Sequence, residues 1–301
     1  MVSVHPSLRG AFERPLLPRV EALLEREQFG EALRDLALRL VAMHDIAPRI
    51  VRYTANLQKW LLTQAILTLC FEHKIDGTRP GLTAAKLVDF FVASNVASRN
   101  TAVAHLAEMR SYKLLLDAEW AGDKRLRPLI VSETAENLIR EWFDGHLKSL
   151  DRLDGGRRHH LSMAEPSLLF FAHPRATRRL FAEPGWCSPP ESVASFVRTE
   201  SGSNILHDLI ARLPKGELPQ GRITIGPLRI SEITSRYIIS NSHAQRVFSR
   251  ARDLAVVGWQ RPGNRGDLWV SSQLVSDYRR WQAVKFAALE EAFDWAVART
   301  I

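Results

Sequence analysis

The strongest constraint on the fold is a pattern that occurs twice, about 142 residues apart. Residues 98–114 and 240–256 each begin with a serine suited to cap a helix, continue with polar and basic residues, and end in an apolar run. The aligned pairs are Ser98 with Ser240, Ala102 with Ala244, Leu106 with Phe248, Met109 with Ala251, Arg110 with Arg252 and Leu114 with Val256. Few residues are identical, but the order of apolar and polar positions repeats, which predicts two copies of one structural unit.

The residues around each copy predict the same order of elements: helix, helix, short turn, helix and β-hairpin. In the first copy we expect helices at 57–73, 83–94 and 98–113, and strands in LLLDAEW and RPLIVS around the charged tip AGDKR. In the second copy we expect helices at 203–213, 231–238 and 240–254, an extended segment at 222–230, and strands at 255–257 and 268–271 around the tip RPGNRG. This order is typical of a winged helix-turn-helix.

A chain of 301 residues is long enough for about two domains. The repeat predicts a mainly α fold with small β-hairpin wings, in which tandem winged helix-turn-helix units stand on a helical platform as a pseudo-dimer within one chain. The predicted parts are an N-terminal unit at 1–150, a polar, glycine-containing linker at 151–160, and a C-terminal unit at 161–301 that ends in a long helix. The helices expected to form the platform are at 19–53, 134–150 and 273–297.

The net charge of +8 and the pI near 9.9 favour a polyanionic partner. The excess is uneven, because residues 236–265 hold six arginines and one aspartate, whereas residues 98–127 hold six basic and four acidic residues. The electrostatic field therefore predicts stronger attraction of DNA to the second copy.

In a winged helix-turn-helix, the helix after the turn enters the major groove and basic residues at the wing tip contact the backbone. Gln can pair with adenine and Arg with guanine, each worth about 1–3 kcal/mol of discrimination. The predicted DNA-binding residues of the second copy are Asn241, Ser242, His243, Gln245, Arg246 and Arg250 on the helix, and Arg261, Asn264 and Arg265 on the wing. Those of the first copy are Ser98, Arg99, Asn100 and Val103 on the helix, and Lys124, Arg125 and Arg127 on the wing.

The first half resembles the MarR family of bacterial transcription regulators over roughly residues 55–150. The segments that carry the resemblance are NVASRNTAVAHLAEMRSYKLLL and DKRLRPLIVSETAENLIREWF; Asp123-Lys124-Arg125 is similar to that family's wing signature. The resemblance implies dimerisation through terminal helices, and aromatic or phenolic effectors bound between platform and winged unit. The chain departs from the family pattern in having Lys113 where a turn glycine is common, a longer segment between Leu87 and Ser98, and a second unit.

Two units in one chain suit a fused dimer, whose recognition helices would lie about 34 Å apart along one face of DNA. Because the two outer helix faces differ, we expect a non-palindromic site. The predicted function is that of a sequence-specific, double-stranded DNA-binding transcription regulator, with further self-association left open.

Two alternatives stay open at this point. Tandem winged helices also occur in plasmid replication initiators, and winged helices also serve as protein–protein interaction modules. The first copy is the better candidate for an interaction module, because its acidic residues include Glu108, Asp117, Glu119 and Asp123.

Other classes find little support in the sequence. It has no phosphate-binding loop ending in Lys-Ser/Thr, no HExxH and no GxSxG, so we expect neither an enzyme nor a cofactor. Two cysteines are too few for a disulfide framework or a four-cysteine zinc site, and no metal is expected. A small aromatic effector is conceivable, with Trp60, Trp142 and Trp281 as a cavity lining or, in the simpler interpretation, as core residues. The sequence shows no membrane span or signal peptide, and we expect a cytoplasmic protein.

Overall fold

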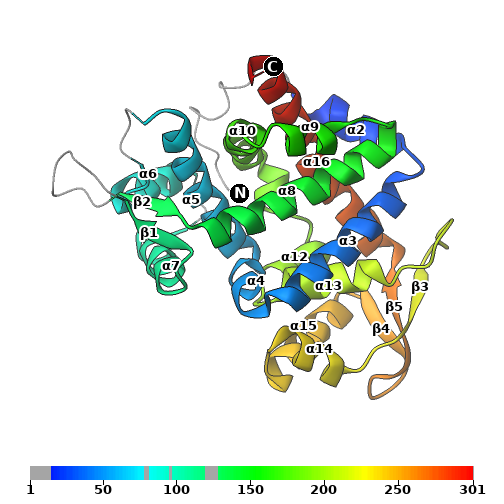
Figure 1. Ribbon diagram of the computed structural model, residues 1–301. Coiled ribbons are helices and arrows are strands. Elements are labelled where there is room, and N and C mark those ends of the chain that lie inside the picture. The colour runs from blue at the N-terminus through cyan, green and yellow to red at the C-terminus, as the bar shows by residue number, and fades with distance from the viewer. Residues whose placement is uncertain (1–14, 78–80, 95–96, 119–127, 301) are drawn as a thin grey trace. The chain divides into compact units, whose positions relative to one another are not determined.

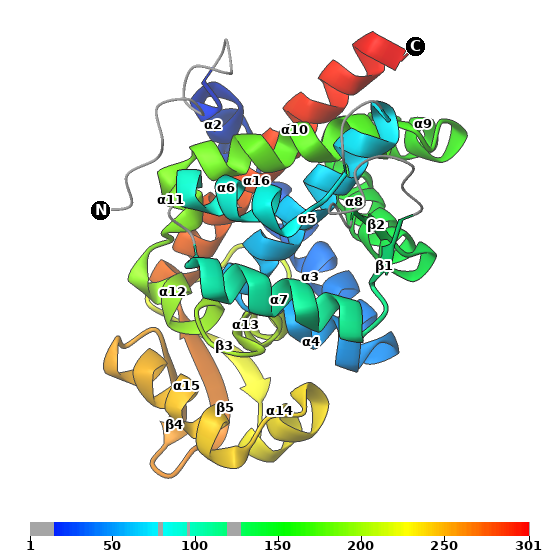
Figure 2. The same ribbon diagram turned by 90° about the vertical axis from the view of Figure 1, so that its left-hand side faces the viewer.

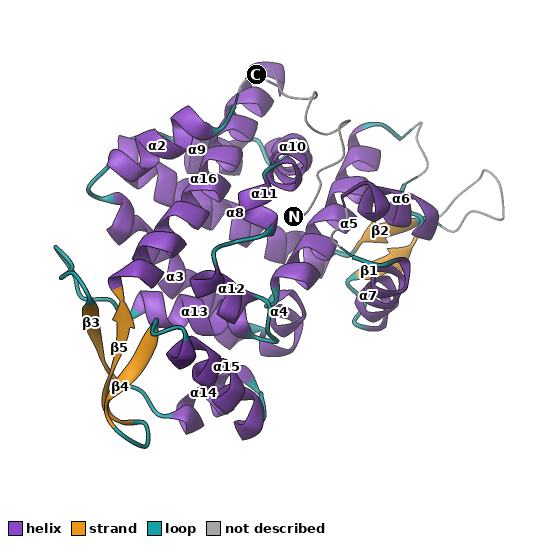
Figure 3. Ribbon diagram, turned by 180° about the vertical axis from the view of Figure 1, so that it is seen from behind, coloured by secondary structure: helices purple, strands orange, loops and turns teal. Residues whose placement is uncertain are grey.

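The computed structural model describes residues 15–77, 81–94, 97–118 and 128–300. These residues are mainly helical, with one two-stranded and one three-stranded antiparallel sheet (Figure 3). The prediction of a mainly α protein with small β-hairpins is confirmed at this level. The chain divides into two compact units: unit 1 contains residues 1–19, 58–187 and 284–301, and unit 2 contains residues 20–57 and 188–283.

This division differs from the split into 1–150 and 161–301 expected from the sequence, because both units are built from separate stretches of chain. Residues 20–57 belong to unit 2, where the helix α3 (Phe29–Ile46) packs against α13 (Gly202–Ala211). The backbone N–H of Ser203 also donates to the carbonyl of Ala55 at 2.9 Å. The last helix, α16 (Ser272–Thr300), contributes its first turns to unit 2 and the rest to unit 1.

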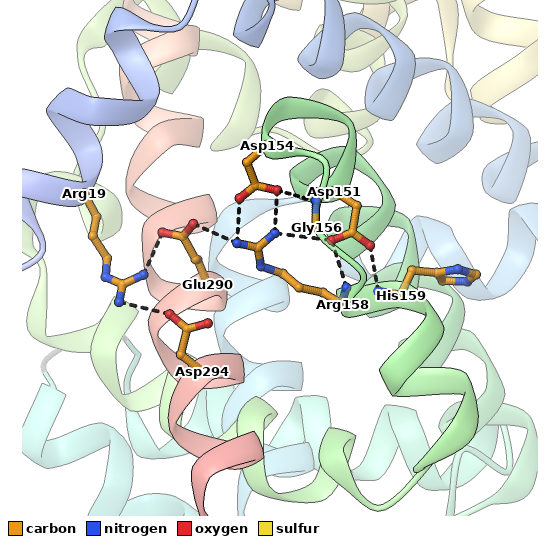
Figure 4. A network of polar contacts seen from close by, with 8 residues as sticks. All are labelled: Arg19, Asp151, Asp154, Gly156, Arg158, His159, Glu290 and Asp294. Carbon is orange, nitrogen blue, oxygen red and sulfur yellow. Dashed lines mark hydrogen bonds and ion pairs between the residues drawn. The ribbon is translucent and has the colours of Figure 1, made fainter. Parts of the chain in front are cut away.

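The predicted linker at 151–160 is a tight turn between two helices of unit 1 (Figure 4). The first helix ends at Asp154, with Gly155 in the left-handed conformation at φ 71°, and the second begins at Arg158. Arg158 forms ion pairs with Asp154 at 2.7 Å, with Asp151 at 3.2 Å and with Glu290 at 3.3 Å. Glycine and polar residues therefore mark a turn here, as expected, but one that ion pairs fix in place.

Unit 1 contains a pattern of helix, bridge, helix, helix, strand, strand and helix. The elements of this pattern are α5 (Leu57–Ile75), a single β-bridge from Leu82 to Leu129, α6 (Ala84–Ser94), α7 (Arg99–Ser111), β1 (Leu115–Asp117), β2 (Leu129–Val131) and α8 (Glu133–Asp154). The remaining helices are α9 (Arg158–Ala164), α10 (Leu168–Ala182) and α11 (Pro184–Cys187). The short helix α2 (Leu17–Glu25) begins in unit 1 and ends in unit 2.

Unit 2 contains the same order of elements, with a full strand in place of the bridge. This order runs through α13, β3 (Arg222–Pro227), α14 (Ile230–Tyr237), α15 (Asn241–Asp253), β4 (Val257–Arg261), β5 (Arg265–Ser271) and α16. The sheet has the strand order β3-β5-β4, and α14 and α15 lie beside it (Figure 1). Two further helices, α4 (Pro48–Thr54) and α12 (Glu191–Val197), belong to this unit.

Candidate nucleic-acid interface

The helices α7 and α15 are local equivalents in the two units, because each has 13 residues and the same cap. The hydroxyl of Ser98 accepts a hydrogen bond from the backbone N–H of Thr101, and that of Ser240 accepts one from His243, both at 3.2 Å. Such a cap satisfies one of the free N–H groups at a helix start. The structure thus confirms both serines as the caps expected from the sequence, and the side chain of Ser98 is exposed at the start of α7.

The buried faces of the two helices match position by position. In α7 the buried residues are Ala102, His105, Leu106 and Met109. In α15 they are Ala244, Val247, Phe248 and Ala251. Each pair is separated by 142 positions, so the spacing predicted from the sequence holds in the packing of both helices.

The backbone that leaves the two helices also repeats. Lys113 and Ala255, which are again 142 positions apart, adopt the left-handed conformation with φ 55° and 54°. The next backbone N–H, that of Leu114 or Val256, donates to a carbonyl of the helix at 3.0 Å in both units. A side chain in this conformation costs about 1–2 kcal/mol, which explains why glycine is common at such turns.

Four polar residues form the exposed strip of α15, which we define as Asn241, Ser242, Gln245 and Arg246. Asn241 lies four positions before Gln245, and Ser242 four positions before Arg246, so each pair stacks along the helix and the two pairs form adjacent rows. Arg246 has no ion-pair partner among the described residues. Figure 2 shows α15 grouped with α14, β4 and β5. This strip matches part of the predicted DNA-binding face.

One flank of α15 is occupied by α12 and the turn that follows it. The rings of Phe196 and Phe248 pack in a T-shaped arrangement with their centroids 6.5 Å apart, and the carbonyl of Glu200 lies 3.0 Å from Nε2 of His243. Arg250 forms an ion pair with Glu191. His243 and Arg250, two of the predicted DNA-binding residues, therefore have partners within unit 2.

The other flank of α15 meets the hairpin of β4 and β5. The ring of Trp259 packs against that of Phe248 at 5.3 Å, and Arg252 donates to the side-chain oxygen of Asn264. Asn264 is thus held within the unit. Arg261 and Arg265 are cross-strand partners next to the hairpin tip; both are exposed and neither has an ion-pair partner in the part of the chain that the structure describes. These two arginines match the predicted wing.

A polar network, which the sequence did not predict, connects α3 and α13 to the end of α14, just before the turn that leads into α15. The ring of His44 on α3 donates through Nε2 to the carbonyl of Arg236 at 2.9 Å and accepts through Nδ1 from Asn204 on α13 at 3.1 Å. The guanidinium of Arg236 holds both oxygens of Asp45, at 3.0 and 2.6 Å, and this pairing lowers the pKa of the Asp45 carboxyl. The bonded residues are about 160 to 190 positions apart in the sequence, so no local sequence pattern predicts this network.

The exposed face of α7 differs from that of α15 in the residues that it presents. Arg99, Asn100 and Val103 are exposed, as predicted, but so are Ala104 and Ala107 along the same helix. The predicted wing residues Lys124, Arg125 and Arg127 lie outside the described residues. The described part of this face thus has two exposed arginines, Arg99 and Arg110, with Val103, Ala104 and Ala107 between them, and Arg110 forms an ion pair with Asp117 at 2.8 Å.

Below α7, a buried histidine takes the place of an aliphatic residue. Nε2 of His105 lies 3.0 Å from the hydroxyl of Thr63, which itself donates to the carbonyl of Lys59. The histidine is 3% exposed, and burial lowers its pKa to about 4. Glu108, one turn further on, forms an ion pair with Lys59 at 3.1 Å. Polar contacts therefore join α7 to α5 at His105, whereas the matching residue of α15 is the buried Val247.

The tryptophans named in the sequence analysis lie in packed side-chain clusters. The rings of Trp60 and Trp142 are 6.0 Å apart in unit 1, and that of Trp281 lies 6.4 Å from Tyr278 in unit 2. A cleft of about 840 Å³ in unit 2 lies between the start of α3, the loop before β3 and the start of α16, and no tryptophan lines it.

The described residues contain no group of three or more His, Cys, Asp or Glu side chains arranged to hold a metal ion. Within the same part of the chain, no helix combines the length and the apolar character that crossing a bilayer requires. Comparisons of the chain with family models, with curated proteins and with solved structures find no match.

Proposed function

We propose that the protein is a sequence-specific, double-stranded DNA-binding transcription regulator made of two winged helix-turn-helix units, in which α15 contacts the bases. The observation that supports this proposal best is the exposed strip of α15, which consists of hydrogen-bonding side chains on a serine-capped helix. A helix of this kind fits the major groove, where Gln and Arg side chains distinguish adenine and guanine. The resemblance of the first half to MarR regulators belongs to the same proposal.

The charges of unit 2 support the same assignment. The segment from Arg222 to Ser271 contains eight arginines and three acidic residues. Arg261 and Arg265 at the hairpin tip add cations beside the helix, where they suit contacts to phosphate. Contacts of this kind position a protein on DNA, while the exposed strip supplies the discrimination between bases.

Selection of binding sites from random duplexes, followed by titration of variants, tests the proposal. We expect Arg246→Ala to lower the affinity for a selected duplex by about 1–3 kcal/mol and to relax the preference at one base pair. Lys215→Ala, which removes one exposed charge from the same unit, should reduce affinity weakly and equally for all sequences. If Arg246→Ala left the affinity for the selected duplex unchanged, the role assigned to α15 would be wrong.

A second candidate function applies to unit 1. The exposed Val103, Ala104 and Ala107 on α7 favour a protein-binding winged helix that makes no base contacts. In the titration above, Arg99→Ala distinguishes the two roles: an unchanged affinity for the selected duplex favours protein binding, and a loss that depends on sequence favours DNA contact by both units.

The sequence of the selected site also separates a regulator from a replication initiator, the alternative that tandem winged helices leave open. A footprint on repeats near a replication origin would favour an initiator. A footprint next to a promoter would favour a transcription regulator.

A further inference from the structure

An acidic residue lies on the flank of the candidate DNA-binding helix and is shared by two arginines. Glu191, the first residue of α12, accepts a hydrogen bond from Nη2 of Arg250, and Nη1 of Arg198 lies 3.9 Å from its other oxygen. All three side chains are about half exposed, at 50%, 50% and 49%. An ion pair with this exposure is weak, so it can open without loss of the fold.

The position of Glu191 follows from how α12 lies against α15. Three contacts in sequence join the two segments: Glu191 with Arg250, Phe196 with Phe248, and Glu200 with His243. Because one set of numbers rises while the other falls, the two segments run antiparallel. The buried aromatic pair in the middle fixes α12, and Glu191 is therefore held beside Arg250 in the folded unit.

We propose that Glu191 competes with DNA phosphate for Arg250, so that it occupies this arginine in the free protein and gives it up to a bound duplex. The inference rests on the proposed DNA binding by α15. A guanidinium forms the same kind of charge-assisted hydrogen bonds with a carboxylate and with a phosphate, so the two are direct rivals. Phosphate contacts carry no sequence information, and the competition therefore lowers the affinity for every duplex by the same factor.

The experiment compares charge-neutralising variants of the full chain in titrations with a selected and an unrelated duplex at several salt concentrations. We expect Glu191→Gln to raise the affinity for both duplexes about two- to fivefold, the size of an exposed ion pair. It should also make the slope of log K against log salt steeper by up to about one, because Glu191 no longer takes up a cation when Arg250 leaves it. The matched control is Glu232→Gln, an exposed acidic residue on α14, for which we expect less than half this gain.

A second comparison isolates the competition from the general field. In an Arg250→Gln background, the gain from Glu191→Gln should fall to that of Glu232→Gln, because the contested arginine is gone. Urea unfolding midpoints show that each variant is folded.

Two results would overturn the inference while DNA binding itself stands. If Glu191→Gln and Glu232→Gln raised the affinity for DNA equally, Glu191 would act only through the general electrostatic field and not by competing for Arg250. A loss of affinity in Glu191→Gln would mean that the ion pair positions α15 for binding. Failure of the unchanged protein and all variants to bind any duplex would instead overturn the proposed function.

Discussion

The helices α7 and α15 share their backbone geometry and buried positions but differ in their exposed residues. Their caps, lengths, buried positions and exit turns coincide at a separation of 142 residues. At the outward positions the residues diverge, because Gln245 and Arg246 correspond to Val103 and Ala104. The comparison teaches that the apolar positions specify this fold, while the outward positions are free to diverge in function.

The divergence extends to the charge on the flank of the helix. Arg250 of α15 pairs with Glu191, whereas the corresponding Glu108 of α7 pairs with Lys59. Both helices thus keep an ion pair to a neighbouring helix at this position, with the signs exchanged. An acidic residue on α7 repels phosphate, so this reversal supports the proposal that unit 2 makes more of the DNA contacts than unit 1.

The largest effect on this comparison is expected from the central apolar residue of each helix. Phe248 is fully buried and contacts two aromatic rings, while its counterpart Leu106 is 7% exposed. We expect Phe248→Ala to lower the free energy of unfolding of unit 2 by about 3–5 kcal/mol, and Leu106→Ala to lower that of unit 1 by about 2–4 kcal/mol. Hydrogen exchange resolved by segment measures the two units separately.

The exposed neighbour Gln245 supplies the control for this pair, because Gln245→Ala should change stability by less than about 0.5 kcal/mol. If Leu106→Ala lowered the free energy of unfolding more than Phe248→Ala, the two helices would not be packed in the same way.

The pH dependence of stability should also separate the two units. His105 has a pKa near 4 in the folded protein, below the value of about 6.5 for an unfolded histidine. Between these values the unfolded chain binds more protons, so the free energy of unfolding falls as the pH drops from 6.5 to 4, by about 3 kcal/mol in total. His173, whose pKa burial lowers to about 3, acts in the same direction in unit 1.

His105→Val, which introduces the residue found at position 247, tests this effect. We expect it to reduce the pH dependence of hydrogen exchange in α7 between pH 6.5 and 4, with the remainder due to His173. The exchange of α15 should show no comparable change. An unaltered pH profile of α7 in His105→Val would contradict a protonation penalty at His105.

Much of each repeated unit could be predicted from the sequence, because its signals are local. Serine caps, apolar positions three and four apart, and basic residues on a hairpin tip all act within a few turns of chain. In this way the sequence predicted that the strip of α15 and the pair Arg261 and Arg265 are exposed, and the structure confirms their exposure. The same local reasoning named His243, Arg250 and Asn264 as DNA-binding residues, but it gave no sign that each has a partner in unit 2.

What the sequence did not reveal depends on contacts between distant segments. The place of residues 20–57 in unit 2 follows from α3 packing on α13, and the network of His44, Asn204 and Arg236 joins residues about 160 to 190 positions apart. The segment 151–160 has the composition of a linker, yet Arg158 reaches Glu290, 132 positions away. Single-sequence patterns carry no information about such pairs.

The smallest expected effect lies at the turn that follows both helices. Ala255 and Lys113 adopt left-handed conformations that glycine tolerates without a steric penalty. We expect Ala255→Gly and Lys113→Gly each to raise the free energy of unfolding by about 0.5–1 kcal/mol, since the relieved strain exceeds the entropy that glycine adds to the unfolded chain. Equal gains, measured by urea unfolding of the full chain and assigned by hydrogen exchange, would extend the equivalence of the two helices to the energetics of their exit turns. If only one variant lost stability, the equivalence of α7 and α15 would end at the helices, because residues with the same φ angle would then be packed differently in the two units.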